Sequence, residues 1–120
     1  MQSPEVVVSV VMTTYNHEAF LAEAIESVLR QRTTFRYEIV IGEDCSTDRT
    51  LELAQRYAAN HPDIVRIVRS ERNVGWRANY RRTIAAAKGR YIALLDGDDM
   101  FIDDDKLQRQ VELLEADTTL

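Results

Sequence analysis

The stretch Tyr91-Ile92-Ala93-Leu94-Leu95-Asp96-Gly97-Asp98-Asp99 decides how this chain of 120 residues folds. An uncharged, mostly apolar run ends abruptly on acids, which is the pattern of a buried strand that carries carboxylates to its carboxyl end. In open α/β sheets, ligands bind at that edge. Three carboxylates within four residues repel one another, and Mg²⁺ or Mn²⁺ relieves that repulsion while bridging to a phosphate. We therefore predict a cation site, with Gly97 leaving room for a phosphate or sugar. The alternative is an acidic turn that caps the next helix.

Strand and helix patterns alternate along the rest of the chain. Strands are expected at residues 6–12, 37–42 and 64–68, and again from Tyr91. The intervening helices are expected to be capped by Asn16 and by Ser46 or Thr47, and the third to span residues 76–87 before a left-handed Gly89. A last helix carries Leu107, Val111 and Leu114 on one stripe. This alternation predicts a Rossmann-like α/β fold, a parallel sheet with helices on both faces.

Composition limits the classes of protein to which the chain can belong. Hydrophobic residues make up 45% and charged residues 29%, which is typical of one soluble globular domain. A net charge of −5 argues against a nucleic-acid partner, which requires a basic surface. Cys45 is the only cysteine, so no internal disulfide or cysteine metal site is expected, and a cytoplasmic location fits best. The first five residues do not resemble a signal peptide, and no apolar run approaches the ~20 residues of a membrane helix.

Polar residues follow three of the predicted strands. They are the segments Thr13-Thr14-Tyr15-Asn16, Glu43-Asp44-Cys45-Ser46 and Asp96-Gly97-Asp98-Asp99. Because the carboxyl ends of parallel strands meet at one edge, we expect these segments to form one crevice. Glycine-rich phosphate loops are missing, so a diphosphate there needs a cation and an arginine, Arg77 or Arg81. Tyr15 can flank a nucleobase, while Glu43 and Asp44 either accept hydrogen bonds from base or ribose or only cap a helix.

Four further residues have side chains that often take part in binding or catalysis. His17 and His61 have no second ligand at metal spacing and are expected to be surface histidines. Ser46 lacks the glycine pair and the histidine partner of a serine hydrolase. Trp76 is expected to pack on the sheet rather than to flank a ligand.

The motifs in this order resemble the family 2 glycosyltransferases of GT-A fold. The resemblance extends from about Val6 to Leu114 and rests on Val8 to Asn16, on Ile41 to Asp48, on Asn73-Val74-Gly75 with Asn79, and on Leu94 to Asp99. The segment Gly42 to Asp48 and the closing Lys106-Leu107-Gln108-Arg109-Gln110-Val111 resemble the bacterial branch that builds surface polysaccharides. The resemblance implies that Thr13 and Tyr15 contact the base and ribose. It also implies that Asp44 hydrogen-bonds the base, most often uracil.

The same resemblance implies a metal site and a reaction. Asp96 and Asp98 match the D-x-D pair, in which Asp98 binds Mn²⁺ or Mg²⁺ directly and Asp96 faces the ribose or the metal. Asp99 positions the donor sugar or supports the metal shell. The family transfers a sugar with inversion from a nucleotide diphosphate donor, here most simply a UDP-sugar. The acceptor would be a glycan or a lipid-linked molecule, reached in the cytoplasm or at the inner face of the membrane.

Family members carry a second half with the catalytic base and the acceptor site. We therefore expect residues 1–120 to be a single donor-binding domain of a larger enzyme, with the base outside it. A missing half would leave apolar surface exposed and favour self-association. Two other readings stay open. One is a nucleotide-sugar-binding module without transferase activity, and the other is a phosphatase of the haloacid dehalogenase type. The phosphatase is disfavoured because its Asp-x-Asp belongs to the first strand of the sheet.

Overall fold

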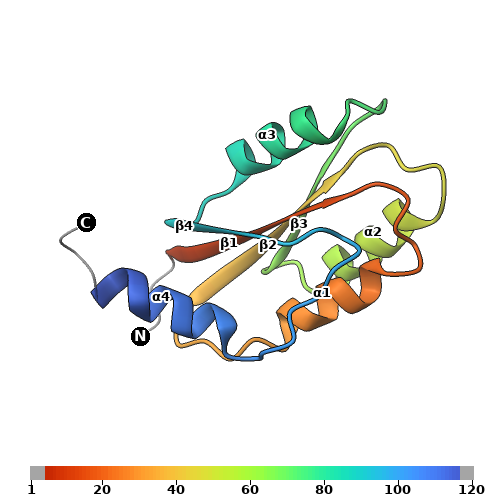
Figure 1. The fold of residues 1–120 in the computed structure, drawn as a ribbon. Helices are drawn as coiled ribbons and strands as arrows, with labels where there is room; N and C mark the ends of the chain where they lie inside the picture. Colours follow the sequence, from red (N-terminus) through yellow and green to blue (C-terminus); the bar gives the residue numbers. More distant parts are fainter. Residues whose placement is uncertain (1–4, 117–120) are drawn as a thin grey trace.

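The computed structural model describes residues 5–116 (Figure 1). The first four residues, part of the segment in which no signal peptide is predicted, lie outside this range. The strands are β1 (Val6–Thr14), β2 (Arg36–Glu43), β3 (Val65–Arg69) and β4 (Tyr91–Leu94). The helices are α1 (Leu21–Leu29), α2 (Thr50–Asn60), α3 (Trp76–Ala86) and α4 (Lys106–Ala116). The four strands form a parallel sheet in the order β3-β2-β1-β4, with α3 on one face and the other helices on the opposite face (Figure 1). The predicted α/β fold is confirmed.

The central strand β1 aligns the carboxyl ends of its two neighbours. It pairs with β2 as far as Thr14, opposite Glu43, and with β4 from Val8, opposite Tyr91, onward. Hydrogen bonding to β1 continues past the end of β4, because the Gly97 N–H donates to the Thr13 carbonyl at 2.9 Å. The acidic segment is therefore attached to the same strand that carries Thr13.

One hydrophobic core lies between the sheet and the helices α1, α2 and α4. Alternate residues of the central strands point into it, as expected for a pleated sheet. Its fully buried members include Val10, Met12, Ile39 and Ile41 from the strands and Leu21, Ile25, Val28 and Leu107 from the helices. Between residues 5 and 116, no helix has both the length and the apolar character needed to cross a bilayer.

On the other face, α3 packs very close to the sheet at Gly42. A Cβ atom added there would lie 2.0 Å from Thr83 Oγ1 and 3.0 Å from Asn79 Oδ1. The Asn79 side-chain amide donates to the Gly42 carbonyl at 2.8 Å. This contact fixes α3, and with it the residues at its first turn, against the centre of the sheet.

A buried charge, Glu38, ties the sheet to the segment that follows α3. Its carboxylate accepts hydrogen bonds from Ser9 Oγ at 2.6 Å, from the Lys88 N–H at 2.7 Å and from Arg66 Nε at 3.0 Å. Burial opposes its ionisation, but these hydrogen bonds outweigh burial and lower the pKa of Glu38.

The predicted helix caps are wrong. Helix α1 begins at Leu21 rather than next to Asn16, and α2 begins at Thr50, whose N–H donates to Asp48 Oδ1 at 2.9 Å. Asn16 takes a left-handed conformation with φ 54°, and its Oδ1 accepts from the Thr47 N–H at 2.8 Å. In turn, the Asn16 N–H donates to Ser46 Oγ. These polar residues therefore bond the two loops to each other and do not cap a helix.

Two predictions, one about Gly89 and one about strand β4, also need correction. Gly89 has no positive φ, but a Cβ atom there would lie 2.6 Å from the Ser9 nitrogen, so close packing explains the glycine. Strand β4 is an edge strand and is not buried on both faces, because Ile92 is 42% and Leu94 56% exposed. At the last helix, Leu107 and Val111 are buried as predicted, whereas Leu114 is exposed.

Candidate functional site

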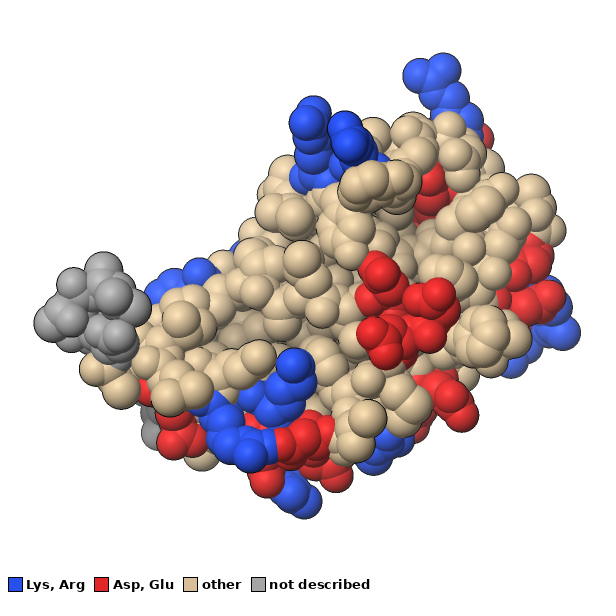
Figure 2. Space-filling view, in the orientation of Figure 1, with Lys and Arg blue, Asp and Glu red and all other residues tan. Residues whose placement is uncertain are grey.

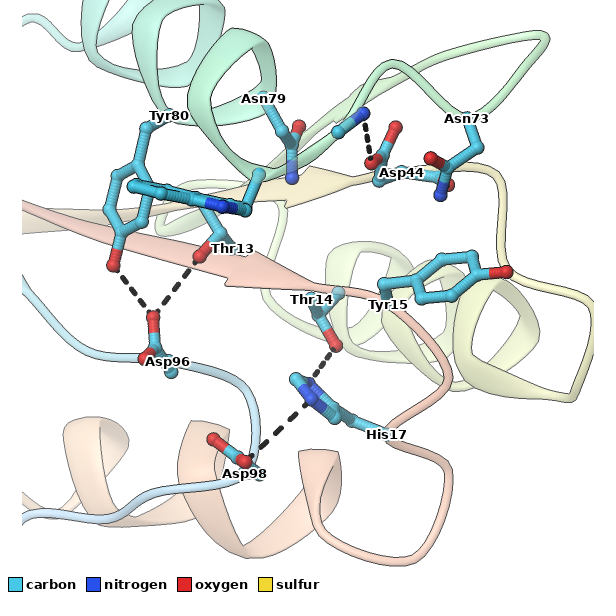
Figure 3. A pocket seen from close by; sticks show the side chains of 12 residues that line it. Thr13, Thr14, Tyr15, His17, Asp44, Asn73, Asn79, Tyr80, Asp96 and Asp98 are labelled. Carbon is cyan, nitrogen blue, oxygen red and sulfur yellow. Dashed lines mark hydrogen bonds and ion pairs between the residues drawn. The ribbon is translucent and has the colours of Figure 1, made fainter.

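A cleft of about 530 Å³ opens at the carboxyl edge of the sheet (Figure 3). That volume lies in the range of small-molecule binding sites. The cleft is lined by Thr13, Thr14, Tyr15, His17, Asp44, Asn73, Gly75, Trp76, Asn79, Tyr80, Asp96 and Asp98. Figure 2 shows acidic side chains gathered in the middle of one face, with Lys and Arg side chains toward its margins. Of the residues predicted to bind nucleotide or metal, the structure brings together Thr13, Tyr15, Asp44, Asp96 and Asp98.

Asp96 is held between β1 and α3. Its Oδ1 accepts hydrogen bonds from Tyr80 Oη at 2.7 Å and from Thr13 Oγ1 at 3.2 Å (Figure 3). Burial, together with this hydrogen bond to Asp96, raises the pKa of Tyr80, so the phenol remains a donor at neutral pH. Tyr80 was not among the residues predicted to form the site. Its only signal was its place one turn into the helix that follows Gly75.

Asp98 projects into the cleft beside His17. Its side chain is 53% exposed, and its Oδ2 lies 3.8 Å from His17 Nε2. His17 Nδ1 in turn lies 2.9 Å from Thr14 Oγ1 (Figure 3). The prediction that His17 is a surface residue is wrong, because its side chain is only 23% exposed and lines the cleft.

Gly97 is a glycine for a reason other than the one predicted. A Cβ atom at this position would lie 2.5 Å from Thr14 Oγ1 and 2.8 Å from His17 Nδ1. The space that a side chain would occupy is thus filled by the protein itself and not reserved for a phosphate or sugar. Gly97 allows the acidic segment to press against Thr14 and His17.

Asp44 holds the loop that leads into α3. It is 3% exposed, and its Oδ1 and Oδ2 accept from the Val74 N–H at 2.8 Å and the Gly75 N–H at 3.0 Å, respectively. Ser70 Oγ also donates to Oδ1, and Asn73 Nδ2 donates to the Asp44 carbonyl. Gly75 has φ 89°, a conformation that favours glycine. Asp44 therefore shapes one wall of the cleft.

Glu43 is buried behind the cleft and does not line it. Its carboxylate accepts from the Cys45 N–H at 3.2 Å and from the Ser46 N–H at 2.8 Å. These bonds hold the turn after β2, so Glu43 neither lines the cleft nor caps α2, which begins only at Thr50.

Arg77 and Asp99 also lie outside the cleft lining. The Arg77 guanidinium stacks over the Trp76 ring, 5.2 Å from its centroid, and Asp99 Oδ1 accepts from the Met100 N–H. The prediction that Trp76 packs on the sheet is wrong. Trp76 is 67% exposed, lines the cleft and meets Tyr80 edge to face.

The oxygen ligands in the cleft fit a hard divalent cation that is coordinated by the substrate as well as by the protein. Within residues 5–116, no three His, Cys, Asp or Glu side chains form a ready-made metal site. Asp96 and Asp98 nevertheless supply carboxylate oxygens on one wall. Mg²⁺ is typically held by one or two carboxylates together with phosphate oxygens and water. The cleft thus matches a cation that arrives with a phosphorylated ligand.

A protein-family model and the names of similar proteins indicate the same family. The model described as "Glycosyl transferase family 2" matches residues 9–120. The putative glycosyltransferase EpsE of Bacillus subtilis (strain 168) is 40% identical over 108 residues, which cover 90% of this chain and 38% of EpsE. The putative teichuronic acid biosynthesis glycosyltransferase TuaG of the same strain is 35% identical over 89% of this chain and 41% of TuaG. The uncharacterized protein Rv1520 of Mycobacterium tuberculosis (strain ATCC 25618 / H37Rv) is 39% identical over 89% of this chain and 31% of its own length.

Solved structures share the fold. TarS residues 1–349 of S. aureus in complex with UDP-GlcNAc superposes with a TM-score of 0.80 at 26% identity, covering 92% of this chain and 32% of that one. The mannosyltransferase PcManGT from Pyrobaculum calidifontis, in complex with GDP-Man and Mn²⁺, gives 0.83 at 25% identity over 100% of this chain and 36% of that one. The predicted GT-A type of α/β fold is confirmed. The chain spans between 31% and 41% of the length of the relatives and solved structures named here.

Proposed function

This chain belongs to glycosyl transferase family 2, and on that premise we propose that it binds the nucleotide-sugar donor of a sugar-transfer reaction. The observation that carries the proposal is the cleft itself. It places an exposed aromatic ring, Tyr15, and a buried acid, Asp44, in one pocket with the exposed carboxylate of Asp98. A nucleoside diphosphate sugar needs these three features, because it has a flat base, a charged diphosphate and a polar sugar.

The base belongs at the Tyr15 end of the cleft. Tyr15 is 42% exposed, and an aromatic face at a polar cleft can stack on a base. Both oxygens of Asp44 already accept backbone N–H groups, but a carboxylate has about four lone-pair sites and can accept a base N–H as well. Complexes of TarS with UDP-GlcNAc and of PcManGT with GDP-Man support a nucleotide sugar as ligand, and we favour a UDP-sugar.

The diphosphate belongs at the Asp98 end. Mn²⁺ or Mg²⁺ would be held there by Asp98, with Asp96 facing the ribose or the metal shell. When bound, the cation stabilises the charge that develops on the leaving diphosphate. The presence of Mn²⁺ in the PcManGT complex supports this assignment. Because Arg77 and Asp99 lie outside the cleft lining, Asp96 and Asp98 carry the proposal.

The whole reaction extends beyond the residues of this chain. We propose transfer with inversion to a glycan or lipid-linked acceptor, with the catalytic base and the acceptor site in further polypeptide and with the enzyme in the cytoplasm or at the inner face of the membrane. The name of TuaG supports a role in cell-surface polysaccharide synthesis. We also propose that the apolar side chains exposed on β4 favour self-association of this chain.

Calorimetric titration of UDP into the chain, with and without Mn²⁺, tests the donor site. We expect binding that requires Mn²⁺, that is lost in Asp98→Ala and that persists in the matched control Asp63→Ala, in which an exposed acid outside the cleft is removed. A parallel titration of GDP identifies the preferred base. Equal binding with and without Mn²⁺ would remove the metal from the proposal. No binding of either nucleotide would overturn the donor site.

A further inference from the structure

His17 lies in the cleft, but the function proposed above gives it no role. The backbone N–H and the backbone carbonyl of His17 are both hydrogen-bonded. The His17 N–H donates to Thr50 Oγ1 at 2.9 Å, and its carbonyl accepts from the Phe20 and Leu21 N–H groups at 2.9 Å each. The imidazole therefore extends from a rigid position immediately after β1.

The contact between Thr14 and His17 bears on which ring nitrogen of His17 carries the proton. The Thr14 residue is 2% exposed, and a buried hydroxyl needs an acceptor for its hydrogen. Within residues 5–116, the one partner of Thr14 Oγ1 is His17 Nδ1, at 2.9 Å. A neutral imidazole has one donor nitrogen and one acceptor nitrogen. If Thr14 donates to Nδ1, the proton of the ring must be on Nε2.

That Nε2–H group faces the carboxylate of Asp98. Nε2 lies 3.8 Å from Asp98 Oδ2, and a movement on the order of 1 Å would bring the two atoms to hydrogen-bond distance. Gly97 allows this approach, since a Cβ atom there would collide with both Thr14 and His17. Figure 3 shows the chain of contacts from Thr14 through His17 to Asp98.

We propose that His17 is a positioning residue for Asp98, with Thr14 selecting the Nε2–H tautomer that orients the Asp98 carboxylate toward a cation in the cleft. Carboxylates that bind metals are commonly held in this way by a hydrogen-bond donor behind them. The protonated Nε2 cannot bind the cation itself, so His17 acts only through Asp98. The cation rests on the proposed function, whereas the tautomer does not.

Nitrogen NMR of the imidazole rings tests the tautomer without any metal. The chain has two histidines, and His61, which stacks on Tyr57, serves as the internal reference. Long-range proton–nitrogen spectra at pH 8 should show the Nε2–H form at His17. Thr14→Val keeps the shape of the side chain but removes the hydroxyl, and should release that preference while the amide spectrum stays folded. An Nδ1–H form in the wild type, or an unchanged Nε2–H preference in Thr14→Val, would overturn the inference.

Mn²⁺ affinity in the presence of UDP, measured by water proton relaxation, tests the effect on Asp98. We expect His17→Ala to weaken Mn²⁺ binding about 10-fold, the size typical of lost outer-shell partners. His17→Gln keeps an N–H near the position of Nε2 and should recover most of the affinity, and His61→Ala should change nothing. Equal losses in the Ala and Gln variants, or no loss in either, would overturn the positioning role. Unchanged Mn²⁺ binding in Asp98→Ala would instead overturn the proposed function and leave the tautomer result standing.

Discussion

Replacing Asp44 by Asn tests whether one buried carboxylate holds the start of α3. Each oxygen of Asp44 accepts a different backbone N–H, from Val74 at 2.8 Å and from Gly75 at 3.0 Å. An amide has only one oxygen, so one backbone N–H in the variant faces an NH₂ group. A hydrogen bond to a charged group contributes about 1.5–3 kcal/mol. We therefore expect Asp44→Asn to lower the free energy of unfolding by about 2 kcal/mol, and Asp44→Ala, which loses both bonds, by about 4 kcal/mol.

Urea unfolding followed by circular dichroism measures these differences. Glu71→Gln is the matched control, because it removes the same charge from an exposed side chain of the same loop. Its effect should stay within about 0.5 kcal/mol. Hydrogen exchange should show that the Val74 and Gly75 amides lose protection in Asp44→Asn. If Asp44→Asn is as stable as Glu71→Gln and both amides remain protected, the carboxylate does not anchor the loop.

Three other predictions follow from the packing and charges described above. Gly42→Ala places a Cβ atom 2.0 Å from Thr83 Oγ1, so it should destabilise the fold by about 1–3 kcal/mol in urea unfolding, and an unchanged midpoint would mean that α3 moves away freely. The pKa of Glu38 is lower in the folded protein than its ordinary value of 4.5. The ionised Glu38 side chain therefore contributes its full stabilisation at pH values above 4.5, and this stabilisation is lost as the pH falls through the lowered pKa. In Glu38→Gln, the free energy of unfolding should therefore fall less steeply with decreasing pH than in the wild type. Equal pH dependence in the two proteins would contradict this. Leu94→Lys should reduce self-association in sedimentation velocity if the exposed side chains of Ile92 and Leu94 drive it, and an unchanged distribution would exclude them.

The fold was predictable because strand and helix patterns alternate along the chain and because β1 is a nearly continuous apolar run. Burial on both faces leaves β1 with seven successive buried residues, a pattern typical of an interior strand of a parallel sheet. The helix starts were not predictable in the same way. Asn16 and Ser46 are good capping residues, and local sequence alone favours that role. In the fold they lie side by side and bond the two loops instead.

The site was predictable where its residues lie at the carboxyl ends of strands or a few residues beyond them, as Thr13, Asp44 and Asp98 do. It was not predictable where a residue reaches the cleft from elsewhere. Tyr80 is on α3, and its hydroxyl meets Asp96 only because Gly42 allows that helix to lie so close to the sheet. That contact depends on tertiary packing and leaves no periodic signal in the sequence.

The strand order has a consequence for the order in which the protein folds. One edge of β1 pairs with β2, which follows it closely in the sequence. The other edge pairs with β4, in which Tyr91 is the partner of Val8, more than 80 residues away in the sequence. Closing a loop of that length is slow compared with forming local contacts. During synthesis, this apolar edge of β1 is therefore unpaired until residues 91–94 have been made, and an unpaired edge can pair with another chain. The side of the cleft that carries Asp96 and Asp98 can form only after β4 has paired with β1. In pulsed hydrogen exchange during refolding, the Leu95 amide, which bonds to β1, should gain protection after the Asp44 amide does.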